Sequence, residues 1–223
     1  MINFEQYLSE RKGSSAGQQT KRKVNIEQLK EMIANKDSDI ADVDVSEIKD
    51  MFNLFFNSDF GGSWTADLSG WDTSKVERME NMFMTCENLT KVELLYTGSV
   101  TNMKNMFFYC KNLKEVSLPH TEKVEDMSGM FVGCKELTKV ELPHTEKVTD
   151  MDRMFIDCKK LTKATIDNIG NVTHVRYMFD GCKNLLQDFS KWDVEGKEHI
   201  DMFKDCAKMR KHPNYYPKNY EGR

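Results

Sequence analysis

The chain has 223 residues, 39% of them hydrophobic and 30% charged, which is typical of a folded protein and excludes collagen-like and low-hydrophobicity disordered chains. Its formal net charge of −4 is unevenly spread: residues 1–23 carry +3 and residues 207–223 carry +4, so the body between them carries −11. An acidic body disfavours nucleic acid as a partner along its length, because phosphates need a positive surface.

Several classes of protein are disfavoured by motifs that the sequence lacks. A membrane-spanning helix needs roughly 18 or more apolar residues, and no stretch approaches that length. Residues 1–10 lack the basic region and apolar run of a secretory signal, so we expect a soluble, cytoplasmic protein of a bacterium or phage-infected host, with reduced cysteines. No hydrolase, zinc-protease, phosphate-loop or dinucleotide motif occurs, so the sequence predicts no enzyme activity and no cofactor.

The N-terminal part of the chain divides into three predicted segments. Residues 1–12 form an amphipathic segment, with Phe4, Tyr7 and Leu8 on one face. Residues 13–23 are small, polar and basic, and predict a flexible linker. Residues 24–45 predict a capping helix and the lead into the next region.

The first ten residues also carry a short motif. Met1-x-x-Phe4-x-Gln6-Tyr7-Leu8-x-Glu10 resembles the targeting peptides of internal head proteins of large contractile-tailed phages. The resemblance implies cleavage after Glu10 and a place in the virion interior. A plain N-terminal helix is the alternative.

A repeat occupies residues 46–209. The pair Met-Phe recurs at steps of 24 residues from Met82-Phe83 onwards, and a cysteine follows each of these methionines four residues later. Coincidence does not produce such spacing, so we expect the repeated side chains to stack in one core. The predicted structural ladder comprises Met82, Phe83, Cys86, Met106, Phe107, Cys110, Met130, Phe131, Cys134, Met154, Phe155, Cys158, Met178, Phe179 and Cys182.

Two periodicities alternate within each unit. Val124, Met127, Met130-Phe131 and Cys134 follow the apolar spacing of a short helix. Val140 then alternates with charged residues, as in a strand with one buried face. The sequence therefore predicts an α/β fold: a solenoid of about seven coils, each a short strand plus a short helix, with one parallel sheet.

These residues resemble a known family. Leu68-Ser-Gly-Trp-Asp-Thr-Ser-Lys-Val76 and the following Met79-x-x-Met82-Phe83-x-x-Cys86-x-x-Leu89 are similar to BspA-like leucine-rich repeats, a domain of unknown function in bacteria, protists and phages. The resemblance implies a leucine-rich-repeat-type fold and a role in binding or adhesion.

Metal and disulfide sites are not predicted. Zinc sites use closely spaced cysteine pairs, whereas neighbouring cysteines here are 24 residues apart. Cysteine and methionine are instead expected as polarizable core fillers. His120 and His144 occupy equivalent turns, and two imidazoles alone make a poor metal site.

The solvent side of the strands is the predicted binding surface, because repeat proteins bind through such faces. It comprises Lys91, Glu93, Glu115, Ser117, Lys139, Glu141, Lys163 and Thr165. Their alternating charges favour a polar protein partner, whose identity the sequence does not give. The interpretation is a non-enzymatic protein-binding module; the alternatives are a phage protein that inhibits a host factor and a cell-surface adhesin. Residues 210–223 are predicted to be a C-terminal tail.

Overall fold

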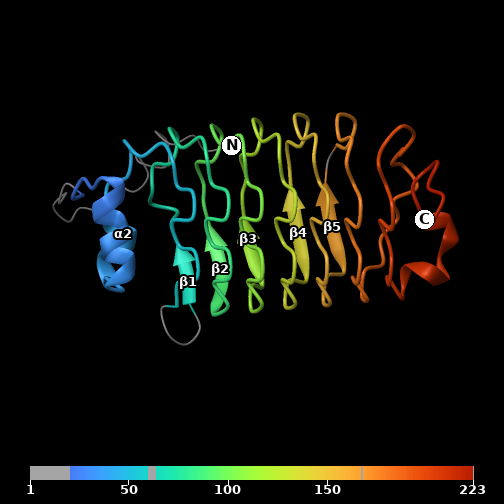
Figure 1. Cartoon of the computed structure of the whole chain (residues 1–223), viewed down its shortest axis with the longest axis horizontal. Coiled ribbons are helices and arrows are strands. Elements are labelled where there is room, and N and C mark those ends of the chain that lie inside the picture. The colour runs from blue at the N-terminus through green and yellow to red at the C-terminus, as the bar shows by residue number, and fades with distance from the viewer. Residues whose placement is uncertain (1–20, 60–63, 167, 223) are drawn as a thin grey trace, which may run out of the picture.

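The computed structural model describes residues 21–59, 64–166 and 168–222. Figure 1 shows the chain running back and forth in turns that lie side by side along the long axis, with a helix at one end and the C-terminus at the other. In chain order the elements are helix α2 (Ile26–Ala34), the 3-10 helix η1 (Ser38–Asp42), strands β1 (Trp64–Asp67), β2 (Leu89–Glu93), β3 (Glu115–Ser117), β4 (Lys139–Leu142) and β5 (Lys163–Ile166), and the 3-10 helices η2 (Met209–Lys211) and η3 (Pro213–Tyr215).

The strands are parallel, as the repeat requires, but they form two sheets. One sheet has the order β1-β2-β3 and the other pairs β4 with β5. Within each sheet the 24-residue period sets the register, so that Lys91 lies beside Glu115 and Lys139 beside Lys163. The single parallel sheet predicted from the sequence is therefore wrong: no strand pairing or backbone hydrogen bond joins β3 to β4, both of which lie wholly within the described residues.

The short helix predicted in each unit is also wrong. The backbone N–H groups of Met79, Asn81 and Phe83 donate to carbonyls of the next repeat, at 2.9 to 3.1 Å, instead of to their own segment. Asn81 has a left-handed φ of 56°, which a right-handed helix does not tolerate. Four-residue turns, such as the one closed by Met82 N–H on the Met79 carbonyl, reproduce the spacing that suggested a helix.

These turn segments form an unbroken ladder along the molecule. Parallel bridges join one residue of each repeat to the next, through Asp50, Arg78, Asn102, Asp126, Asp150, His174 and Glu198. The turn side therefore continues past the β3–β4 junction, where the strand side is interrupted.

The core between the two sides is built from stacked identical residues. Successive phenylalanine rings lie 5.0 to 5.5 Å apart and within 13° of parallel. The stack comprises Phe55, Phe83, Phe107, Phe131, Phe155, Phe179 and Phe203. Offset stacking of this kind contributes about 0.5 to 1.5 kcal/mol per pair beyond the area buried.

Both ends of the stack are covered. At one end α2 buries Leu29, Met32 and Ile33, and its first turn is closed by a capping box between Asn25 and Gln28. At the other end the rings of Tyr216 and Tyr220 pack edge-on against Phe203, the last ring of the stack. Capping of this kind shields the apolar end faces of a repeat protein.

The predicted linker and tail are partly ordered by backbone contacts. Arg22 O accepts a hydrogen bond from Asp44 N–H, and Lys23 forms a parallel bridge with Asp44. In the tail, Lys218 forms a parallel bridge with Asp193. The amphipathic segment 1–12 and most of the linker lie outside the described residues.

Candidate functional site

The ladder residues lie in the core and offer no reactive group. All fifteen have no exposed surface. Each cysteine is a free thiol that donates to the carbonyl of a phenylalanine, as Cys134 Sγ does to Phe107 O at 3.1 Å. Burial raises the pKa of Cys86 to about 12 and that of Cys134 well above 9.0. The thiolate needed for nucleophilic or metal chemistry is therefore absent at neutral pH.

The predicted binding residues lie on one face of the strands. Lys91 and Glu93 come from β2, Glu115 and Ser117 from β3, Lys139 and Glu141 from β4, and Lys163 and Thr165 from β5. Glu115, Lys139, Glu141 and Lys163 are exposed, and the other four are half-buried. We call these eight residues the strand face.

The two sheets differ in how they arrange charge on this face. In the first sheet, Lys91 Nζ lies 3.7 Å from Glu115 and 3.8 Å from Glu93, so its charge is compensated. In the second sheet, Lys139 and Lys163 are register partners, and neither forms an ion pair with any described residue. Like charges directly opposite one another on neighbouring strands repel. The second sheet therefore carries two unpaired lysines against one unpaired glutamate, Glu141, among the described residues.

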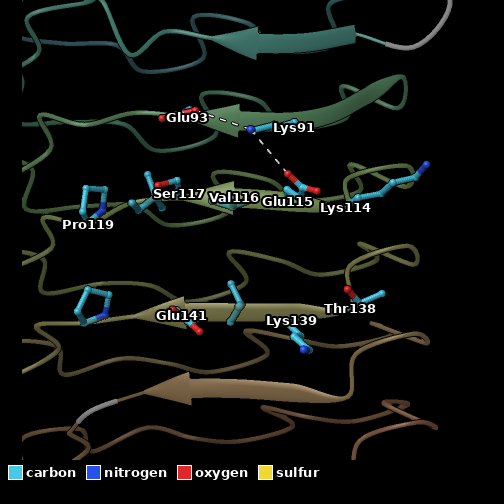
Figure 2. A pocket seen from close by; sticks show the side chains of 13 residues that line it. Lys91, Glu93, Lys114, Glu115, Val116, Ser117, Pro119, Thr138, Lys139 and Glu141 are labelled. Atoms are coloured by element: carbon cyan, nitrogen blue, oxygen red, sulfur yellow. Dashed lines mark ion pairs between the residues drawn. The ribbon is translucent and has the colours of Figure 1, made fainter.

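A cleft lies over the junction of the two sheets. It has a volume of about 650 Å³, and six of the eight strand-face residues line it, all except Lys163 and Thr165. Its apolar lining includes Val116, Leu118 and Val140, and the latter two are 3% exposed. Figure 2 shows Lys114 and Lys139 toward one end of this cleft and Pro119 toward the other.

The cleft exists because β3 and β4 are not hydrogen-bonded. The outer edge of β5 shows how the same backbone position is satisfied elsewhere: Ala164 N–H donates to Gln187 Oε1 and Gln187 Nε2 donates to Ala164 O, both at 2.9 Å. Val116 is the equivalent of Ala164 two repeats earlier. No described side chain caps Val116 in this way, so its peptide group faces the cleft.

The turn histidines come together with a carboxylate that the sequence did not predict. His120 Nδ1 lies 3.0 Å and His144 Nε2 lies 4.0 Å from Glu122 Oε1. Although burial opposes ionisation, the hydrogen bond from His120 lowers the pKa of Glu122. Across the described ranges, no three histidine, cysteine, aspartate or glutamate side chains are arranged to hold a metal ion.

Two further expectations concern the processing site and membrane-spanning helices. Glu10, the predicted processing site, lies outside the described residues. Among the described helices, none has the length and apolar character needed to cross a membrane.

Three features of this region were not predicted from the sequence. Lys114 precedes the strand-face pattern by one residue and was not selected, yet it lines the cleft. The interruption between β3 and β4 and the Gln187 cap were also missed. Gln187 occupies the repeat position that Lys163 holds one unit earlier. The change from a charged side chain to a carboxamide at that position was the signal that could have predicted the cap.

A family model matches most of the chain. The family described as "Mycoplasma protein of unknown function, DUF285" matches residues 24–139 and, in a second match, residues 101–216. The chain belongs to this family. The match confirms the resemblance to BspA-like leucine-rich repeats drawn from the Met-Phe-x-x-Cys-x-x-Leu spacing, and the DUF285 repeats span both sheets and the cleft.

Solved structures with some similarity include leucine-rich repeat proteins. A leucine-rich cell surface protein of Faecalibacterium prausnitzii is 23% identical over 63% of this chain and 42% of its own, with a TM-score of 0.45. The leucine-rich repeat protein of T. pallidum is 20% identical over 74% of this chain and 87% of its own, with a TM-score of 0.46. This chain thus spans less than half of the first protein's length. None of the curated proteins matches it.

Proposed function

We propose that this DUF285 protein is a non-enzymatic protein-binding module that uses the strand face of an approximately seven-coil solenoid. The observation that carries the proposal is the cleft, because six strand-face residues chosen from periodicity line it together. The ladder side chains are buried in the core, whereas the strand face presents polar and charged groups to solvent.

The chemistry of the strand face favours a protein partner. Lysines and glutamates line the cleft together with the apolar side chains of Val116 and Val140. The surface therefore offers both polar and apolar contacts, as protein–protein interfaces do. The thiols are the nucleophiles of the core, and the raised pKa of each keeps it protonated. A catalytic site would need converging acid and base groups, and binding alone explains the arrangement.

We also propose the division of the chain. Residues 1–12 and 13–23 form the amphipathic segment and linker, residues 24–45 the cap, residues 46–209 the repeats, and residues 210–223 the tail. A role inside a virion rests on Glu10 and is separate from binding by the repeats.

The test compares two charge-reversed variants in affinity capture from a bacterial lysate. One carries Lys139→Glu and Lys163→Glu on the strand face, and the control carries Lys104→Glu and Lys147→Glu, which are also exposed but lie outside it. We expect a protein identified by mass spectrometry to be retained by the wild type and the control and lost from the strand-face variant. Equal retention by both variants would reject this surface.

A further inference from the structure

We propose that the cleft between β3 and β4 binds an extended acidic polypeptide segment, whose backbone pairs with the open peptide of Val116. Its carboxylates contact Lys114 and Lys139, which line the cleft, and Lys163, the register partner of Lys139 on β5. The inference rests on the proposed function and specifies the partner's chemistry. Two independent observations support it: an unpaired backbone position and uncompensated charge at the same place.

The backbone observation concerns the outer side of β3. Val92, Val116, Val140 and Ala164 hold the same position in four successive repeats. The peptide groups of Val92 and Val140 bond to the next strand, β3 and β5 respectively, and that of Ala164 bonds to the side-chain amide of Gln187. Each of these bonded peptide groups thus has a partner that offers both a donor and an acceptor. Val116 is the member of this series without such a partner, because no described group bonds across the junction. An unmade backbone hydrogen bond is costly unless water or a ligand supplies it.

A peptide group is the ligand that this position fits. Val116 presents one N–H donor and one C=O acceptor, and the Gln187 amide satisfies the equivalent pair on β5. A partner in extended conformation offers the same two groups along its backbone, as when a strand joins an exposed sheet edge. Val116 is only half-buried, so a ligand in the cleft can reach it.

The charge observation concerns the lysines around the cleft. Lys111 and Lys160, in the turns that precede β3 and β5, form ion pairs with Glu87 and Glu136 respectively. By contrast, Lys114, Lys139 and Lys163 are exposed and have no carboxylate partner in the described part of the chain. Lys139 and Lys163 are register partners on neighbouring strands, so their like charges lie side by side. A partner that brings carboxylates would remove this repulsion.

The same surroundings disfavour nucleic acid. Glu93, Glu115 and Glu141 line the cleft among the lysines and would repel any evenly charged polyanion, so a partner must space its anionic groups to meet the lysines. A phosphate also offers only acceptors, so it leaves the Val116 carbonyl without a donor. A polypeptide with spaced carboxylates satisfies both the lysines and the open peptide.

The binding experiment uses the full chain and a fluorescein-labelled peptide in which glutamate alternates with serine, which we call oligo-glutamate. The cleft variant carries Lys114→Gln, Lys139→Gln and Lys163→Gln. The matched control carries Lys104→Gln, Lys123→Gln and Lys147→Gln, which change the net charge equally at exposed sites away from the cleft. None of these lysines forms an ion pair with a described residue, so we expect all three proteins to fold, and thermal unfolding checks this.

We expect the peptide to bind the wild type and the control, with affinity that falls as salt rises, and to bind the cleft variant about tenfold more weakly. Equal weakening by both variants would show a diffuse charge effect and would overturn the proposal. Tighter binding of oligo-thymidine than of oligo-glutamate would overturn it in favour of nucleic acid. If the peptide does not bind while the strand-face variant still loses its captured protein, this inference fails and the proposed function stands.

A second measurement separates backbone pairing from simple charge attraction. In the free protein, the Val116 amide should exchange its hydrogen with solvent faster than the Val140 amide, because Val140 is buried and paired with β5. Saturating oligo-glutamate should slow exchange at Val116 and leave Val140 unchanged. Unchanged Val116 exchange on binding would contradict the backbone part of the proposal.

Discussion

The turn side and the strand side of this molecule follow the same 24-residue period with different results. On the turn side, bridges run from Asp50 to Glu198 without interruption, and the phenylalanine stack lies beneath them. On the strand side the ladder stops between β3 and β4. The stack therefore does not depend on a continuous sheet. The turn side and the core hold it together, and this leaves the strand side free to carry a cleft.

The largest expected effect on the core is alkaline unfolding. An unfolded thiol ionises near its usual pKa of 9.0, whereas burial raises the pKa of Cys86 and Cys206 to about 12. The stability from neutral buried thiols is complete below pH 9 and is lost as pH rises from about 9 to about 12. Each thiol should lower the free energy of unfolding by about 1.4 kcal/mol per pH unit in this window. Urea denaturation at several pH values measures the slope.

The control for this prediction removes one thiol from the ladder. Cys134→Ala is less stable at neutral pH because it leaves a small cavity, but its alkaline slope should be smaller by about one proton. An identical slope in Cys134→Ala would mean that groups other than the cysteines cause the alkaline loss.

The next largest effect is loss of a ring from the stack. Phe131 has no exposed surface and lies 5.4 Å from both Phe107 and Phe155, so Phe131→Ala should lower the free energy of unfolding by about 3 to 5 kcal/mol. Phe52 is 42% exposed, with the Arg78 guanidinium 5.2 Å above its ring, so Phe52→Ala should cost less than about 1 kcal/mol. Urea denaturation compares them, and similar costs would contradict a core centred on the stack.

A smaller effect is expected at the capped edge of the strand side. Gln187→Ala removes both hydrogen bonds to the Ala164 peptide and should cost about 1 kcal/mol. Gln187→Glu keeps an acceptor but has no donor for the Ala164 carbonyl, so it should cost a similar amount. Thermal unfolding measures both variants. No loss in either would mean that an open peptide at this position is inexpensive, and would weaken the case that Val116 needs a ligand.

The sequence predicts those features that depend on side chains recurring at a fixed step. The spacing of Met130, Phe131 and Cys134 was enough to place them in one core, and alternation around Val140 was enough to find a strand. The helix prediction failed because turns bonded to the next repeat bury the same positions as a helix bonded to itself. The interruption after β3 could not be predicted, since periodicity specifies which residues face the core but not whether neighbouring strands pair.

The smallest effect separates stability from binding on the strand side. Lys139 and Lys163 are register partners with like charges, so Lys163→Glu should raise the free energy of unfolding by about 0.5 kcal/mol by creating an opposite-charge pair. Lys163→Gln only removes the repulsion and should gain less. The same Lys163→Glu change should weaken oligo-glutamate binding, because the new carboxylate occupies Lys139 and repels the peptide. Urea denaturation and fluorescence anisotropy measure the two effects on one protein. A variant that is less stable and binds more weakly would show that these lysines support the fold. A variant that is more stable but binds more weakly would show that the strand side gives up stability to keep its positive charge available to a partner.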